Sequence, residues 1–257
     1  MPSEEGSGLL ACFWSGFAWH ALAALAIFAG GNVINDVCDV EVDRINAPTR
    51  PLPSGEVSTR AAVAWTGLLF GIGGGASVVA GWISGYWATG VALWAIGWLI
   101  VYSLWLKGRV LVGNVTIAML AGLLVLYGAH AVGGQWYSGI VGAVFAFGTT
   151  FARELVKDLA DVEGDRALGL RTLAIVSPMT ARALVMLSAL TVFAFGGGFA
   201  HLPRSSPLLS IALGVILVLG VLAMLTRSAD RFRAQAIAWK ITMLVGMGAL
   251  ILASMFT

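Results

Sequence analysis

Two short segments of this chain concentrate most of its carboxylates, and each follows a long apolar run. The first segment, residues 35–43, contains Asn35, Asp36, Asp39, Glu41 and Asp43. The second segment, residues 153–165, contains Glu154, Asp158, Asp161, Glu163 and Asp165. Carboxylates gathered in this way can hold a hard cation, so the elements that carry them decide what chemistry is possible.

Helical spacing brings the members of each segment onto one face. If the helix before the first segment continues to Asp43, then Asn35, Asp39 and Asp43 lie within about 80° of one another. In the second segment Glu154, Asp158, Asp161 and Asp165 fall within about 60°. Carboxylates this close repel each other unless a cation lies among them.

The donor atoms in both segments are oxygens, which Mg²⁺ prefers, commonly together with substrate phosphates. The segments contain no histidine, and this argues against zinc. Together they predict a Mg²⁺ site for a diphosphate substrate. Either segment alone would more often be a solvated acidic loop at the end of a helix.

The composition places these segments in a membrane protein. Of the 257 residues, 59% are hydrophobic and only 11% are charged, whereas a soluble domain carries about a quarter charged residues. The mean hydropathy is +0.90, and the 33 glycines suit closely packed membrane helices. A net charge of +2 gives no reason to expect a nucleic-acid partner.

Apolar runs long enough to cross a bilayer, about 20 residues each, predict an all-α integral membrane protein with one domain over residues 1–257. We expect a bundle of about eight transmembrane helices at residues 10–35, 60–81, 86–106, 112–132, 138–157, 179–200, 207–226 and 234–256. Lysines and arginines concentrate in alternate connections, so the positive-inside rule puts both acidic segments at cytoplasmic helix ends.

These residues resemble the UbiA superfamily of intramembrane prenyltransferases. The stretch from Asn35 to Gly55, with its NDxxDxxxD and RPLPSG elements, is similar to the first family signature. The stretch from Arg153 to Leu173, with DxxxD at Asp161–Asp165, is similar to the second. The resemblance covers essentially the whole chain. It implies Mg²⁺-dependent transfer of a prenyl group from an isoprenyl diphosphate to a lipophilic acceptor.

The resemblance also implies roles for single residues. The expected Mg²⁺ ligands are Asn35, Asp36, Asp39, Asp43, Asp158, Asp161 and Asp165, with Asp36 and Asp158 in supporting positions. The central carboxylates for catalysis would be Asp39, Asp43, Asp161 and Asp165. The basic residues expected to hold the diphosphate are Arg50, Lys107, Lys157 and Arg171. For each basic residue, anchoring the membrane topology is an equally good reading.

Within the superfamily, the run REhhKDhxDhEGDRxxGhRTL (h, apolar) resembles the archaeal-type digeranylgeranylglyceryl phosphate synthases, which implies geranylgeranylglyceryl phosphate as acceptor. Quinone-ring prenyltransferases share the general frame and chlorophyll synthases share EGDRALGL, so these acceptors stay open. A membrane transporter is the alternative from outside the enzymes, and an inactive paralogue is a further one. The family usually has nine helices, and the first helix, with its Arg-Pro-x-Asn element, is expected to be missing.

Several other residues carry weaker expectations. Phe145, Phe147 and Phe151 are candidates to line a groove for the prenyl tail. Asn114 either orients an acceptor or makes a hydrogen bond between helices. The three histidines are scattered along the sequence, and no role is assigned to them.

Overall fold

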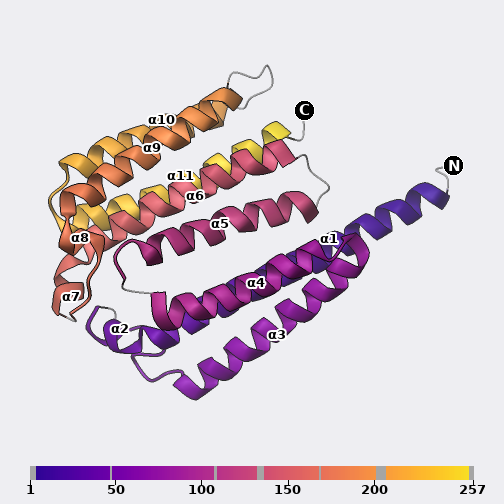
Figure 1. Cartoon of the computed structure of the whole chain (residues 1–257), viewed down its shortest axis with the longest axis horizontal. Coiled ribbons are helices and arrows are strands. Elements are labelled where there is room, and N and C mark those ends of the chain that lie inside the picture. Colours follow the sequence, from indigo (N-terminus) through magenta and orange to yellow (C-terminus); the bar gives the residue numbers. More distant parts are fainter. Residues whose placement is uncertain are drawn as a thin grey trace. The chain divides into compact units, whose positions relative to one another are not determined.

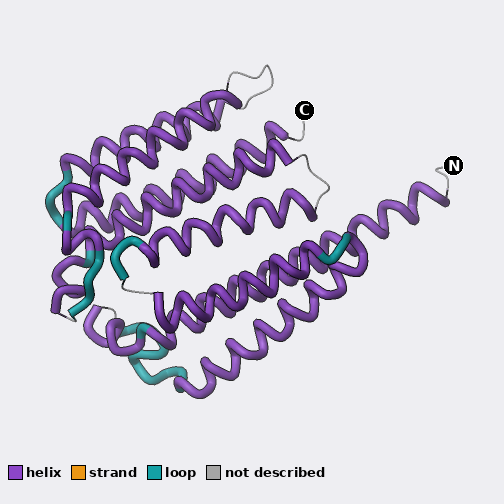
Figure 2. Tube along the Cα trace, viewed as in Figure 1, coloured by secondary structure: helices purple, strands orange, loops and turns teal. Residues whose placement is uncertain are grey.

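The computed structural model describes residues 4–46, 48–106, 109–131, 136–167, 169–200 and 207–254. All regular structure in these ranges is helical (Figure 2). In chain order (Figure 1) the helices are α1 (Glu4–Cys38), α2 (Val40–Asn46), α3 (Thr59–Ser84), α4 (Trp87–Val101), the π-helical turn η1 (Tyr102–Leu106), α5 (Val112–Ala131), α6 (Trp136–Ala160), α7 (Val162–Ala167), α8 (Leu173–Val176), α9 (Pro178–Ala200), α10 (Pro207–Leu225) and α11 (Ala229–Ser254).

Seven helical segments of the described residues are long and apolar enough to cross a membrane. They are Gly16–Cys38, Thr59–Ser84, Trp87–Leu106, Val112–Ala131, Gly139–Ala160, Pro178–Gly197 and Pro207–Leu225. Seven of the eight predicted spans are thereby confirmed. The eighth, residues 234–256, falls on α11, which is helical over 26 residues but is not among the seven.

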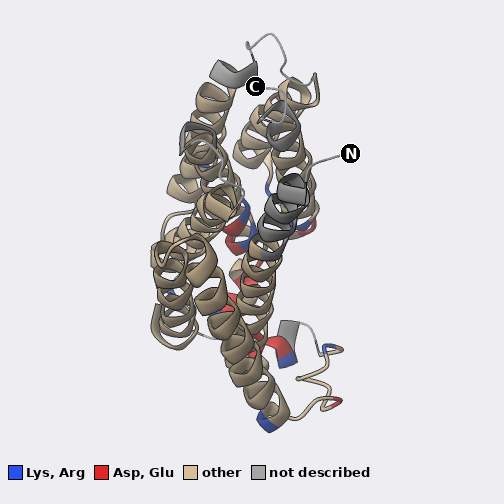
Figure 3. Ribbon diagram, turned by 90° about the vertical axis from the view of Figure 1, so that its right-hand side faces the viewer, with Lys and Arg blue, Asp and Glu red and all other residues tan. Residues whose placement is uncertain are grey.

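Charged residues interrupt the helices at few places. In Figure 3 most of the helical ribbon carries neither a basic nor an acidic residue, and the charged positions form short groups. This distribution is what a lipid environment demands, because a charge in the hydrocarbon layer is costly unless it faces a partner or a polar cavity.

The chain divides into two compact units. The first unit comprises Met1–Lys107 and Tyr127–Gln135, and in it α1, α3 and α4 pack together. Gly73 permits the close approach of α3 to α1, because a Cβ there would lie 2.6 Å from Ile27 Cγ1 and 3.2 Å from the carbonyl oxygen of Ala23.

The second unit comprises Gly108–Leu126 and Trp136–Thr257. Its core lies among α6, α9, α10 and α11, where fully buried side chains include Leu155, Val185, Leu213, Ile216 and Trp239. The ring of Phe145 on α6 lies against Gly246 on α11, where a Cβ would come within 2.2 Å of Phe145 Cζ. A single domain over residues 1–257 remains a prediction.

Candidate active site

The two acidic segments have the same local construction, each within its own unit. A long helix ends just before an aspartate, at Cys38 before Asp39 and at Ala160 before Asp161, and a short helix follows. Helical hydrogen bonds continue through both junctions. The amide of Asp39 donates to the carbonyl of Asn35 (2.9 Å) and that of Asp43 to the carbonyl of Asp39 (2.7 Å).

At the second junction the amide of Asp161 donates to Lys157 (3.0 Å), and that of Asp165 donates to Asp161 (2.9 Å). The predicted continuation of the helix to Asp43 is therefore right in its hydrogen bonding but not in its regularity, because a turn intervenes at Asp39. In both segments the aspartate after the junction is buried, Asp43 at 7% and Asp165 at 9% exposure.

Arg50 lies among the carboxylates of the first segment. Its guanidinium donates to Asp43 Oδ2 at 2.7 Å and lies 3.7 Å from Asp36 Oδ1. The hydrogen bond to Asp43 raises the pKa of Arg50, and the charges of Asp43, Asp36 and Asp39 add to this, while burial opposes it. The positively charged guanidinium of Arg50 therefore lies between two of the carboxylates that were predicted to bind Mg²⁺, those of Asp36 and Asp43.

The loop that presents Arg50 is a compact turn. The amide of Ser54 donates to the carbonyl of Arg50 (2.9 Å), and that of Val57 to the carbonyl of Pro51 (3.0 Å). Gly55 has φ +83°, a conformation that residues with a Cβ rarely adopt. The RPLPSG element thus has a structural reason for its glycine, which is to close the loop between α2 and α3.

Asn35 is held within the first unit by the π-helical turn η1. The hydroxyl of Ser103 donates to Asn35 Oδ1 at 2.7 Å. Because the oxygen of the amide accepts this bond, the hydroxyl orients the side chain that was predicted to be a metal ligand. Ser103 was not anticipated from the sequence, where it lies 68 residues away.

Asp158 in the second segment contacts α5. Asn114 Nδ2 donates to Asp158 Oδ2 at 2.9 Å. This bond between helices agrees with one of the two readings of Asn114. At the end of α7, Gly169 has φ +71° and the amide of Leu170 donates to the carbonyl of Asp165 (2.9 Å), which terminates the short helix in the usual glycine-dependent way.

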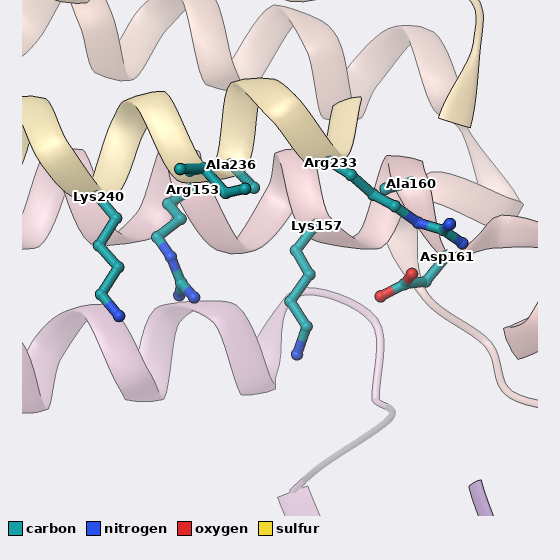
Figure 4. A pocket seen from close by; sticks show the side chains of 8 residues that line it. Arg153, Lys157, Ala160, Asp161, Arg233, Ala236 and Lys240 are labelled. Atoms are coloured by element: carbon teal, nitrogen blue, oxygen red, sulfur yellow. The ribbon is translucent and has the colours of Figure 1, made fainter. Parts of the chain in front are cut away.

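A cleft of about 380 Å³ lies between α6 and α11 in the second unit (Figure 4). Its lining residues are Arg153, Lys157, Ala160, Asp161, Arg233, Ala236, Ile237 and Lys240. Lys157 and Asp161 were predicted site residues. Arg233 and Lys240 were not among the predicted site residues, and the structure brings them beside the second acidic segment.

Two other predicted site residues are not among those that line this cleft. Arg171 is exposed between α7 and α8 and does not line the cleft. Lys107 lies outside the described residues. Within the described ranges no three His, Cys, Asp or Glu side chains form a group that could hold a metal ion, and each acidic segment belongs to a different unit. The Mg²⁺ site accordingly stays a prediction.

The aromatic residues expected to line a groove differ from one another. Phe145 is 2% exposed and belongs to the core of the second unit. Phe151 is also buried, whereas Phe147 is exposed and stacks on Phe151 with ring centroids 6.0 Å apart. Phe145 is therefore a packing residue, and Phe147 remains a candidate for contact with a prenyl tail.

Two of the histidines that are scattered in the sequence meet in the first unit. His20 Nδ1 is 3.0 Å from Tyr127 Oη and its Nε2 is 2.7 Å from Ser84 Oγ. The ring of His130 lies 6.2 Å from that of His20 and 4.8 Å from that of Trp87. Together they form a buried polar contact of α1 with α3 and α5.

A sequence profile of the UbiA prenyltransferase family matches residues 10–250. A digeranylgeranylglyceryl phosphate synthase of Thermococcus kodakarensis is 37% identical over 249 residues, which cover 91% of this chain and 85% of that protein. The synthase of Halobacterium salinarum is 45% identical over 148 residues, 58% of this chain. In that comparison the chain spans about half the length of its relative, 52%.

Solved structures share the fold. A structure described as giving insights into digeranylgeranylglyceryl phosphate synthase in membranes aligns with a TM-score of 0.70 at 23% identity, covering 96% of this chain and 94% of that chain. A UbiA homologue from Archaeoglobus fulgidus bound to GPP and Mg²⁺ aligns with a TM-score of 0.59 at 17% identity, covering 93% and 95%. The extent of the profile match and the identity to the Thermococcus protein together show that this chain belongs to the UbiA prenyltransferase family.

Proposed function

We propose that this protein transfers a geranylgeranyl group from geranylgeranyl diphosphate to geranylgeranylglyceryl phosphate, in the synthesis of ether lipids. The observation that carries the proposal is the matched construction of the two acidic segments, each with one aspartate at a helix junction and a buried aspartate four residues later. The names of the relatives favour this acceptor. Family membership favours an enzyme over a transporter.

The donor set suits Mg²⁺ as the cofactor. The predicted ligands Asn35, Asp36, Asp39, Asp43, Asp158, Asp161 and Asp165 offer only amide and carboxylate oxygens, which this ion prefers. Arg50 lies between Asp36 and Asp43, so this carboxylate pair accepts positive charge. When bound, Mg²⁺ would supply neutralisation of the diphosphate charge.

The chain's own residues would then act on the two substrates. Arg50 and Lys157, with Lys107 and Arg171 as further candidates, would hold the diphosphate through hydrogen bonds assisted by charge. These bonds strengthen as the allylic C–O bond breaks and its electron pair moves to the leaving diphosphate.

The acceptor hydroxyl completes the reaction. Its oxygen forms the new C–O bond to the allylic carbon, and its proton passes to a carboxylate of the acidic segments or to the departing diphosphate. The apolar spans exclude water, which would otherwise capture the allylic carbon. The concentration of basic residues in alternate connections supports an active site that faces the cytoplasm.

The test is prenyl transfer by detergent-purified protein, with labelled geranylgeranyl diphosphate, in the presence and absence of Mg²⁺. Geranylgeranylglyceryl phosphate and 4-hydroxybenzoate are offered together as acceptors. Label in the glycerol lipid that depends on Mg²⁺ is the expected result. Label in the aromatic acid would instead assign the protein to quinone synthesis, and transfer to neither acceptor would refute the proposed function.

A further inference from the structure

The cleft between α6 and α11 has a strong excess of positive charge. Four of its lining side chains are basic, Arg153, Lys157, Arg233 and Lys240, and one is acidic, Asp161. In Figure 4 the side chains of Arg153, Lys157 and Lys240 extend toward the same side, and Arg233 lies near Asp161. The lining therefore has a formal net charge of +3, which is four positive charges less one negative charge.

The protein neutralises part of this charge and leaves both lysines without an ion pair among the described residues. Arg153 makes an ion pair with its neighbour Glu154. Arg233 lies 3.7 Å from Asp230, but both side chains are mostly exposed, so this contact is weak. Within the described ranges no ion pair is formed by Lys157 or Lys240.

The cations follow the helices inward from the acidic junction. On α6, Arg153 and Lys157 precede Asp161 by eight and four residues, so Arg153 lies about 12 Å along the helix from Asp161. On α11, Lys240 follows Arg233 by seven residues, two turns further along the same face. Arg153 and Lys157 belong to a segment long and apolar enough to cross a membrane, Gly139–Ala160, and an ionisable residue in such a segment marks a functional site by default.

We propose that this cleft binds the phosphate monoester of the acceptor lipid, an inference that rests on the proposed function. The donor diphosphate would be held by carboxylates through Mg²⁺, whereas a row of cations with a single carboxylate suits an anion bound directly. A phosphate held by Arg233 and Lys240 on α11 lies close to Asp161, while Lys157 on α6 stays available for the donor diphosphate. The glycerol hydroxyl is within three carbons of that phosphate, so it is kept near the second acidic segment.

The test compares acceptors with and without the phosphate. Arg233→Gln and Lys240→Gln should each raise the KM for geranylgeranylglyceryl phosphate about tenfold, the loss expected for one charge-assisted hydrogen bond. The KM for geranylgeranyl diphosphate should stay within about twofold, as should the KM for the unphosphorylated alcohol geranylgeranylglycerol, because neither compound has a phosphate monoester for Arg233 and Lys240 to bind. Arg231→Gln is the matched control, since Arg231 lies on the same helix but does not line the cleft.

If the KM for the donor rises while the KM for the acceptor is unchanged, the cleft binds the diphosphate and the inference is overturned. The inference is also overturned if neither KM changes. Direct binding of geranylgeranylglyceryl phosphate, measured by calorimetry in detergent, separates this inference from the proposed function. If the wild-type protein transfers nothing but binds this lipid, and Lys240→Gln loses the binding, the inference stands while the proposed function fails. If the wild-type protein does not bind it, the inference fails.

Discussion

The contact of Gly246 with Phe145 determines how closely α11 approaches α6, the two helices that form the cationic cleft. A Cβ added at Gly246 would lie 2.2 Å from Phe145 Cζ, 2.8 Å from Cε1 and 3.1 Å from Cε2. Carbon atoms in contact are normally about 3.5–4.0 Å apart. The ring of Phe145 is only 2% exposed and sits within the core of the second unit, so it has little room to move aside.

We therefore expect Gly246→Ala to lower the free energy of unfolding by about 1–3 kcal/mol, the usual result of overpacking a core. Thermal unfolding of the detergent-purified protein, followed by far-UV circular dichroism, should show a drop of several degrees. The matched control is Gly248→Ala on the same helix, where an added Cβ meets no atom within 4 Å. That variant should unfold at or slightly above the wild-type temperature, because alanine favours helix more than glycine does.

A second change tests whether Phe145 is the cause. Phe145→Leu in the Gly246→Ala background removes the ring atoms that the new methyl group meets, so it should recover part of the lost stability. The close approach of α6 and α11 would be refuted if Gly246→Ala unfolded at the same temperature as Gly248→Ala. It would also be refuted if the double variant were less stable than the two single changes predict by addition.

Four further variants test the acidic segments and the histidine contact. Asp39→Ala and Asp161→Ala should each abolish prenyl transfer while the unfolding temperature stays near that of the wild type, and full activity in either would show the metal-site assignment to be wrong. Arg50→Gln should raise the KM for geranylgeranyl diphosphate about tenfold or more, from the loss of a charge-assisted hydrogen bond; an unchanged donor KM would place Arg50 outside the donor site. His20→Phe leaves the buried hydroxyl of Tyr127 without this partner, so unfolding should become easier by about 1–3 kcal/mol, and an unchanged unfolding temperature would contradict this.

Most of the helical architecture could be predicted from hydropathy alone, because an apolar run of about 20 residues has few other uses. The short helices α2, α7 and α8 were not predicted. They are seven, six and four residues long, and their charged or short sequences give no apolar run to detect. The burial of Phe145 also could not be read from the sequence, since an aromatic residue on a membrane helix can face lipid or core equally well.

The site was predictable where its residues are neighbours in the chain. The spacing of Asp39 with Asp43, and of Asp161 with Asp165, identified both acidic segments. Arg233 and Lys240 were missed as partners of Lys157 because they lie on another helix, and contact between α6 and α11 depends on tertiary packing. One signal was present: a lysine at position 240 lies inside a predicted span, where a charge calls for a polar neighbour.

The two acidic segments solve one structural problem in the same way. If a long apolar helix continued regularly through a segment with four charged residues, some of these charged side chains would face lipid or the protein core. At Asp39 and at Asp161 the regular helix is interrupted, yet the amides of both junction aspartates, and those of Asp43 and Asp165, still donate to carbonyls four residues earlier. These four amides thus stay paired across the interruption, as buried backbone groups must. Because Asp39 and Asp161 occupy equivalent junctions, replacing either should affect transfer alike, and unequal effects would mean that only one segment serves the donor.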